Sequence, residues 1–171
     1  MEHMTYRLLT RDDLPGCADV IVEAYRDVNQ HFGFPENPDA DQLISQLQKQ
    51  LDDKAYLYGC YLNGQQIGCF ILSEQDEEVF EVSKLCILPA WRDQGYGNEA
   101  LDAALETIQV MGGTSAVAAV IYENDVVRSW LARRGFAEGF VGMIAGMTFS
   151  ICLMQKSLSS GQCGGCDGCG E

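Results

Sequence analysis

Two glycines at a predicted strand-to-helix junction constrain the fold of this chain most. The apolar segment 79–88 reads as a β-strand and ends at a proline, and residues 95–111 carry apolar side chains at helical spacing. Between them Arg92 precedes Gly95 and Gly97 in the sequence RDQGYG. Glycine lets a backbone approach a ligand closely, and a helix N-terminus attracts anions. The junction therefore predicts an anion site, with Arg92 ordering the turn or adding charge, built from the amides of Gln94, Gly95, Tyr96, Gly97, Asn98 and Glu99.

Two other phosphate-binding loops fit this junction less well. The dinucleotide-binding pattern G-x-G-x-x-G opens a βαβ unit and has a third glycine, where this chain has Ala100 and a preceding hairpin. A P-loop requires Gly-Lys-Ser/Thr after the glycines, and that sequence is missing. What fits is R-x-x-G-x-G at the start of a helix, whose amides suit a pyrophosphate.

The order of predicted elements indicates a mixed α/β fold. The pattern predicts a strand near 6–8, helices over about 14–25 and 43–51, two strands over 56–72 that turn at Asn63-Gly64, a strand over 79–88, a helix over 95–111, a strand over 115–122, a short helix capped by Asn124, and strand over 140–154. This order is β-α-α-β-β-β-α-β-α-β, in which Gly142 and Gly146 can split the last strand. We expect one domain over residues 1–156, with a single mixed sheet and helices on both faces, followed by a flexible Gly/Ser/Cys-rich tail over 157–171. The uncharged run 115–122 predicts a strand buried on both faces.

Charge and hydropathy limit the partners of this chain. The net charge is −14, which repels nucleic acid and anionic lipid, so neither partner is expected. The N-terminus has no apolar leader pattern, and the longest uncharged apolar run is too short for a bilayer, so the expected location is cytoplasmic. The single cysteines inside apolar segments read as small buried hydrophobic residues in a reducing cell: Cys17, Cys60, Cys69, Cys86 and Cys152.

The loop and its surroundings resemble the GNAT superfamily of N-acetyltransferases. The segment VFEVSKLCILPAWRDQGYGNEAL (79–101) is similar to that family's fourth strand, pyrophosphate loop and third helix. The segment YENDVVRSWLARRGF (122–136) is similar to its later asparagine, short helix and Gly-Phe pair. The order of strands and helices matches over roughly residues 5 to 155. The resemblance implies that acetyl-CoA is the co-substrate.

The resemblance also implies roles for individual residues. The pantetheine arm would lie between the fourth and fifth strands and pair with backbone groups of Cys86, Ile87 and Leu88. A bulge in the strand would free these groups for pairing. An amide near Ile87 would polarise the acetyl carbonyl. Asn124 would reach the pantetheine or the diphosphate, serve as a plain N-cap, or do both.

Three residues are candidates for the chemistry. Glu81 stands fourteen residues before Gly95, where histone-type members of the family have a catalytic glutamate, and it would take the amine proton. Alternatively, it extends the acidic turn that the sequence predicts at 73–78 and faces solvent. Ser83, on the same strand face, would hold a water or contact the substrate. Tyr122 would face the cleft or pack in the core. Many members have a tyrosine seven residues after the asparagine, but here Leu131 occupies that position, so the general acid is not identified.

The last residues pose a separate question. Cys163, Cys166 and Cys169 have the spacing C-x-x-C-x-x-C and could bind Zn²⁺ or another soft metal, or form a redox-active tail without a ligand.

The leading interpretation is an acetyltransferase that moves the acetyl group of acetyl-CoA to an amine of a small molecule or peptide. The alternative is a catalytically weak CoA-binding module whose cysteine tail senses metal or redox state. A homodimer is compatible with the sequence, which does not specify the oligomeric state or the acceptor.

Overall fold

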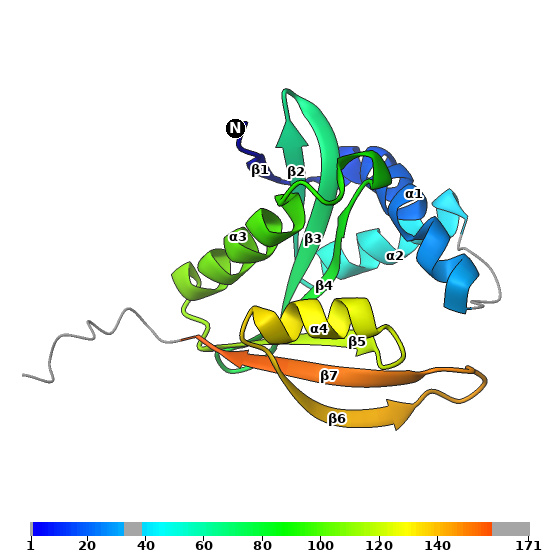
Figure 1. Ribbon diagram of the computed structural model, residues 1–171. Helices are drawn as coiled ribbons and strands as arrows, with labels where there is room; N and C mark the ends of the chain where they lie inside the picture. The colour runs from blue at the N-terminus through cyan, green and yellow to red at the C-terminus, as the bar shows by residue number, and fades with distance from the viewer. Residues whose placement is uncertain (1, 33–38, 159–171) are drawn as a thin grey trace, which may run out of the picture.

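The computed structural model describes residues 2–32 and 39–158, which form a seven-stranded sheet with helices on both faces (Figure 1). The elements in chain order are β1 (Thr5–Leu8), α1 (Leu14–Phe32), α2 (Ala40–Asp52), β2 (Tyr56–Leu62), β3 (Gln65–Asp76), β4 (Val79–Ile87), α3 (Tyr96–Val110), β5 (Ser115–Ile121), α4 (Asp125–Arg133), β6 (Ala137–Met143) and β7 (Ser150–Ser157). Short 3₁₀ turns precede α1 and follow β4, at Arg11–Asp13 and Pro89–Trp91. This confirms the predicted order, and the last strand is divided into β6 and β7.

The strands lie in the order β1-β2-β3-β4-β5-β7-β6. All neighbours are antiparallel except β4 and β5, which are parallel. The β2–β3 hairpin turns where the sequence predicts it, because Asn63 and Gly64 both have positive φ, of 51° and 80°. The sheet therefore has one position where two parallel neighbours meet, and the candidate site lies there.

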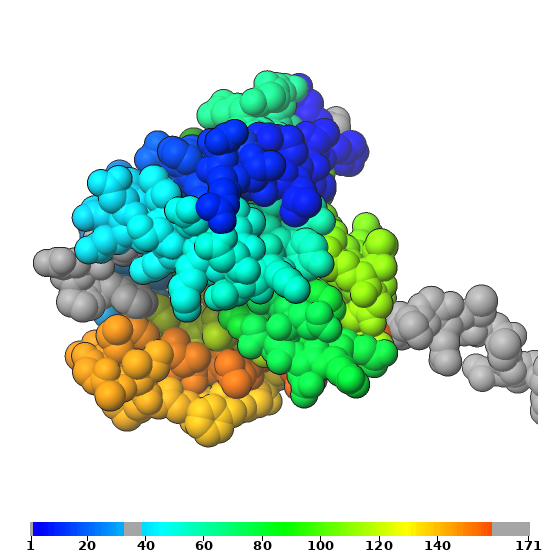
Figure 2. All heavy atoms as spheres, turned by 180° about the vertical axis from the view of Figure 1, so that it is seen from behind, coloured from blue at the N-terminus to red at the C-terminus, as the bar shows by residue number. Residues whose placement is uncertain are grey.

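Each face of the sheet has its own apolar core. On one face, which we call the α3 core, Ala100 and Ala104 are fully buried and let α3 lie close to the strands. On the other face, the α1 core, Ala18 and Ile21 of α1 and Leu47 of α2 pack on the sheet. Figure 2 shows this second face, with α1 and α2 covering its upper part and the β6–β7 hairpin below them. The five single cysteines are buried and unpaired, as predicted.

Two sequence expectations are corrected by the fold. The acidic segment 73–78 was expected to be a turn, but β3 continues to Asp76 and only Glu77 and Glu78 turn, because Glu74 pairs with Phe80 of β4. The strand at 115–122 is not buried on both faces, because Ala119 is exposed where β5 leaves β4.

Within residues 2–32 and 39–158, none of the helices has the length and apolar character that crossing a membrane requires.

Candidate active site

The candidate site lies where β4 and β5 separate. Only Val79–Glu81 of β4 pairs with Ser115–Val117 of β5. Beyond these residues β4 continues beside β3, and β5 continues beside β7, so the two parallel strands diverge (Figure 1). The gap is a cavity of about 500 Å³ whose lining comes from both faces of the sheet, including α1, α3 and α4. A ligand in this gap can therefore contact groups from both faces.

A β-bulge in β4 shapes the wall of the cavity. One residue of β3, Phe70, stands opposite two residues of β4, Lys84 and Leu85. Lys84 has a φ of 48°, in the left-handed region, and both bulge residues line the cavity. The Leu85 carbonyl accepts a hydrogen bond from the hydroxyl of Tyr25 in α1, at 3.2 Å. The bulge thus joins α1 to the site.

The bulge is followed by the three residues whose backbone was expected to pair with a ligand. The Leu88 amide donates to the Ile67 carbonyl at 2.7 Å, and the Leu88 carbonyl accepts from the Trp91 amide at 2.9 Å. Neighbouring strand residues direct their backbone groups to opposite edges, so Cys86 faces β3 as Leu88 does, and the Ile87 amide faces the gap. Of the three residues expected to pair with the pantetheine arm, only Ile87 directs its amide to the gap, because the backbone groups of Cys86 and Leu88 face β3.

The loop before α3 provides a set of free amides. Gly95 caps the helix with a φ of 90°, a conformation that favours glycine. The amides of Tyr96, Gly97 and Asn98 lie in the first turn, where a helix offers no carbonyl partner. A Cβ at Gly95 would meet nothing within 4 Å, and one at Gly97 would meet only the Trp130 ring, at 3.9 Å. The space over this turn is therefore open to an anionic ligand.

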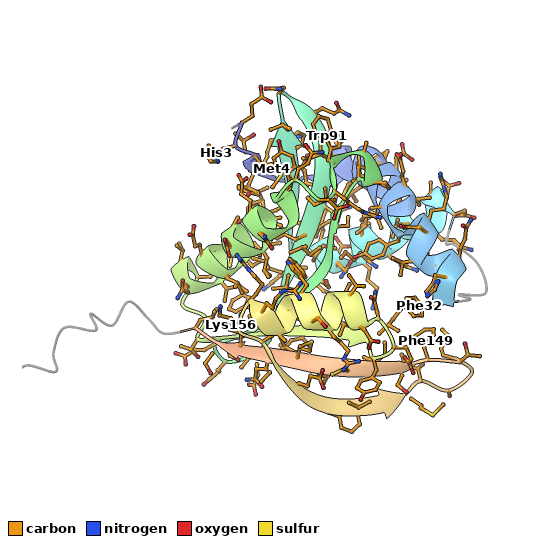
Figure 3. The ribbon with its side chains drawn as sticks, in the orientation of Figure 1. His3, Met4, Phe32, Trp91, Phe149 and Lys156 are labelled. Atoms are coloured by element: carbon orange, nitrogen blue, oxygen red, sulfur yellow. The ribbon has the colours of Figure 1, made fainter. Side chains whose placement is uncertain are left out.

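Glu99 does not belong to this set of amides. Its amide donates to the Gly95 carbonyl at 3.1 Å, and its carboxylate accepts from the Met4 amide at 2.9 Å and lies 3.8 Å from His3. Figure 3 shows His3 and Met4 on the side of the molecule where α3 lies. The expected anion contact at Glu99 is corrected, because this residue is bonded within the helix and to the start of the chain.

Two polar contacts order the loop and the first turn of α3. The Asn98 side chain accepts a hydrogen bond from Trp130 Nε1 at 2.6 Å, and Trp130 lines the cavity. This bond joins the first turn of α3 to α4. The Gln94 side chain donates to the Ala90 carbonyl at 3.4 Å, within the loop. The free amides of α3 therefore lie next to the cavity.

Arg92 orders the turn, which is the first of the two roles considered for it. Its Nε donates to the Ile87 carbonyl at 3.1 Å, and its guanidinium also bonds the Ala24 carbonyl and, at 2.7 Å, Asp27. The hydrogen bond and charge of Arg92 lower the pKa of the Asp27 carboxyl. The arginine thus ties the end of β4 and the loop to α1.

The ion pair between Arg92 and Asp27 predicts a small pH-dependent contribution to the free energy of unfolding. Because the Asp27 pKa is lower in the folded protein than in the unfolded chain, the stabilisation by this ion pair is fully present above the unfolded pKa of about 3.9. It disappears as the pH falls through the pKa of Asp27 in the folded protein. The Asp27 side chain is 61% exposed, so we expect Asp27→Asn to cost at most about 1 kcal/mol at pH 7. Urea unfolding of parent and variant should show this difference at pH 7 and none near pH 2. An equal difference at both pH values would contradict the assigned ion pair.

Asn124 caps α4 and also lines the cavity. Its Oδ1 accepts a hydrogen bond from the Val127 amide at 3.3 Å. Because its side chain lies at the rim, the capping role and a role in ligand contact are compatible.

The three candidate catalytic residues do not meet at one point. Ser83 lines the cavity. Glu81 lies two residues earlier on the same strand face, half-buried, opposite Val117 where β4 and β5 still pair. Tyr122 does not line the cavity: its ring lies 4.1 Å from the Arg128 guanidinium. Tyr122 follows the last residue of β5, and its ring packs on Arg128 of α4.

The structure adds Tyr25 to the site, a residue at the end of the helix that the apolar spacing predicts over about 14–25. Tyr25 lines the cavity, and burial together with the nearby thiols of Cys86 and Cys69 raises its pKa well above the usual range, against a smaller opposite effect of Arg92. Its hydroxyl is therefore protonated at neutral pH. The one sequence signal for this role was the hydroxyl of a tyrosine at an apolar helical position. The spacing of apolar residues alone could not show that the helix borders a cavity.

The predicted metal ligands Cys163, Cys166 and Cys169 lie outside the described residues. In the part of the chain that the structure describes, no cluster of three or more His, Cys, Asp or Glu side chains could hold a metal ion.

The chain is similar to known proteins in its sequence and in its fold. A sequence profile of the acetyltransferase (GNAT) family matches residues 20–136. A comparison with curated protein sequences gave no match.

Solved structures share the fold at low sequence identity. A GNAT family acetyltransferase from Elizabethkingia anophelis with acetyl-CoA bound is 16% identical, with a TM-score of 0.71 over 92% of this chain and 100% of that chain. The ribosomal-protein-S18-alanine N-acetyltransferase from Escherichia coli is 14% identical, with a TM-score of 0.74 over 91% and 94%. The PaiA N-acetyltransferase from Thermoplasma acidophilum, in complex with coenzyme A, is 18% identical, with a TM-score of 0.69 over 90% and 98%.

Proposed function

Because the chain belongs to the acetyltransferase (GNAT) family, we propose that it moves the acetyl group of acetyl-CoA to a primary amine of a small molecule or a protein. The observation that carries this proposal is the cavity between β4 and β5. Its rim adjoins the first turn of α3 through the bond between Trp130 and Asn98, and its opposite wall is formed by α1. One passage thus connects an anion site with a place for an acceptor.

Acetyl-CoA would supply the thioester, and this chain's residues fit its two main parts. The amides of Tyr96, Gly97 and Asn98, with the positive end of the α3 dipole, would hold the diphosphate. The open space over Gly95 and Gly97 supports this assignment, since a Cβ at Gly95 would meet no protein atom within 4 Å and one at Gly97 would meet only the Trp130 ring. The Ile87 amide would hold the arm that lies in the gap, and Asn124 would contact it at the rim.

The reaction requires a neutral amine. A lysine-like amine has a pKa of about 10.4, so losing its proton at pH 7 costs about 4.6 kcal/mol. We propose that Glu81 takes this proton, through a water held by Ser83, because the two side chains share one face of β4 and Ser83 reaches the cavity. The neutral amine then attacks the thioester carbonyl, and the Ile87 amide stabilises the developing oxyanion.

The acceptor wall is apolar. On the α1 side the lining includes Val22 and Val28, with Ile151 of β7 opposite, and no Asp or Glu is among the described residues that line the cavity. The acidic residues of α1 and α2 therefore lie outside the lining of the cavity. An apolar environment disfavours a charged amine, so these walls favour an acceptor with an apolar body and one amine.

We expect the acceptor preference to follow this wall. A panel of 2-phenylethylamine, spermidine, L-glutamate and a peptide with a free N-terminal alanine should be tested with acetyl-CoA by thiol release and product mass spectrometry. Burying an apolar side chain is worth about 1.5–3 kcal/mol, so kcat/KM for 2-phenylethylamine should exceed that for spermidine by at least about tenfold. A preference for spermidine would contradict the apolar acceptor.

The same assay separates the enzyme from the alternative, a CoA-binding module with little catalysis. Leu131 lines the cavity from α4 and carries no transferable proton, which is the observation that favours the alternative. Acetyl-CoA binding in a calorimetric titration without thiol release for any amine would support the module. Release of one thiol per acetylated amine would support the enzyme.

A further inference from the structure

We propose that Tyr25 of α1 donates the proton that the departing CoA sulfur needs, a role that rests on the acetyltransferase function proposed above. When the bond between carbon and sulfur breaks, a thiolate is released, and it is a poor leaving group unless a proton reaches it. The donor must therefore reach the cavity beside the stretch of β4 that holds the thioester. Tyr25 satisfies this requirement from α1, because its side chain lines the cavity and its hydroxyl bonds the Leu85 carbonyl of β4.

The position of the Tyr25 hydroxyl is fixed by the bulge. It donates to the Leu85 carbonyl at 3.2 Å, and Leu85 lies two residues before Ile87, whose amide faces the gap. The ring lines the cavity from α1. A proton on this hydroxyl therefore lies along the strand segment that the thioester would occupy. Rotation about the C–O bond of the phenol changes its acceptor from the carbonyl to a sulfur in the gap.

Few other groups around the cavity can donate a proton. Leu131 and Val127 of α4 have none to give, and Tyr122 is turned toward Arg128. Ser83 is assigned to the water on the acceptor side. Lys84 lines the cavity as well, so its role has to be separated from that of Tyr25 by experiment.

The charged and titratable groups around Tyr25 act on its protonation in opposite directions. Cys86, Cys69 and Arg92 lie close enough to affect its charge, and Arg92 is bonded to the carbonyl of the neighbouring Ala24. Burial and the two thiols keep the phenol protonated, so a proton is present on it before the reaction. Arg92 provides positive charge that would favour a phenolate formed for an instant.

The proton balance closes without another reactant. The amine nitrogen forms a bond to the acetyl carbon, and the bond between that carbon and sulfur breaks. The first amine proton leaves to Glu81 before attack. The second proton passes from the positively charged nitrogen of the tetrahedral intermediate to the Tyr25 oxygen, while the phenol's own proton passes to sulfur. The products are the amide and CoA thiol, and Tyr25 is neutral again.

The test compares Tyr25→Phe with the parent for two acetyl donors and the most active amine of the panel. Acetyl-CoA has a basic leaving group that needs a proton, whereas p-nitrophenyl acetate releases a phenolate that is stable without one. We expect kcat with acetyl-CoA to fall about 10²-fold while the rate with p-nitrophenyl acetate changes less than threefold. The dissociation constant for acetyl-CoA should stay within twofold. Tyr58→Phe removes a hydroxyl from a half-buried tyrosine outside the cavity and should match the parent.

The other outcomes overturn the role. An equal loss with both donors would mean that Tyr25 only supports the bulge, and no loss would mean that the sulfur obtains its proton elsewhere. If Lys84→Met, and not Tyr25→Phe, shows the donor-dependent loss, Lys84 is the acid. A parent that binds acetyl-CoA but releases no thiol overturns the acetyltransferase function itself, together with the role that depends on it. An active parent with an unaffected Tyr25→Phe overturns only the role of Tyr25.

Discussion

Replacing Gly97 with glutamate should abolish acetyl-CoA binding while the fold stays as stable as in the parent or becomes more stable. At this helical position a Cβ meets only the Trp130 ring, at 3.9 Å, so the side chain fits. Glutamate is also a better helix former than glycine by roughly 0.5–1 kcal/mol, and a negative charge in the first turn favours the helix dipole. The same side chain would fill the space over the free amides and repel a diphosphate.

We expect the dissociation constant for acetyl-CoA to rise by at least about 10³-fold, because an anion would lose its amide donors and meet a like charge, each worth at least about 2 kcal/mol. Isothermal titration calorimetry measures the binding, and urea unfolding measures the stability. Gly16 in the first turn of α1 provides a matched control, since a Cβ there meets nothing within 4 Å. Gly16→Glu should stabilise the protein to a similar degree and leave the dissociation constant unchanged. Tight binding by Gly97→Glu would contradict the anion site.

The second large effect is expected from Glu81→Gln. If Glu81 takes the amine proton, this change keeps the side-chain shape and removes the base, so kcat at pH 7 should fall about 10²–10⁴-fold. The loss should shrink at higher pH, because more of the amine is then neutral in solution. Thiol release measured from pH 6 to 10 would show both features.

An exposed carboxylate on the neighbouring strand supplies the control for this experiment. Glu74 of β3 is exposed and pairs with Phe80, one residue before Glu81. Glu74→Gln makes the same change in charge close by and should leave the pH profile of the parent unaltered. If both variants lose the same fraction of activity, the effect is one of surface charge. If Glu81→Gln keeps the parent rate at every pH, another group or the solvent takes the proton.

The fold was predictable because each element has a strong local signal. The turn residues Asn63 and Gly64 fix the β2–β3 hairpin, and the spacing of Leu101, Ala104 and Ile108 fixes the buried side of α3. The amide set at the start of α3 was predictable for the same reason, since Gly95 adopts a positive φ that its type favours. In these regions the local preference and the packing agree.

The cavity was harder to predict, because it depends on contacts between distant parts of the chain. The sequence left two roles open for Arg92, ordering the turn or adding charge, and only the contacts of its guanidinium with Asp27 and the Ala24 carbonyl of α1 favour the first. Tyr25 has the spacing of a core residue, and only the divergence of β4 from β5 places it beside a cavity. Leu88 follows the strand pattern of Ile87, but its backbone is satisfied by β3 and the following turn. None of these partners is visible in the local sequence.

The most direct test of the central claim is an NMR titration of ¹⁵N-labelled protein with acetyl-CoA. The account predicts that the amide resonances of Gly97 and Asn98 shift most as the diphosphate binds, followed by that of Ile87, while the amide of Glu99, bonded to the Gly95 carbonyl, shifts little. Saturable binding that leaves the amides of the first turn of α3 unshifted, or no binding at all, would contradict it.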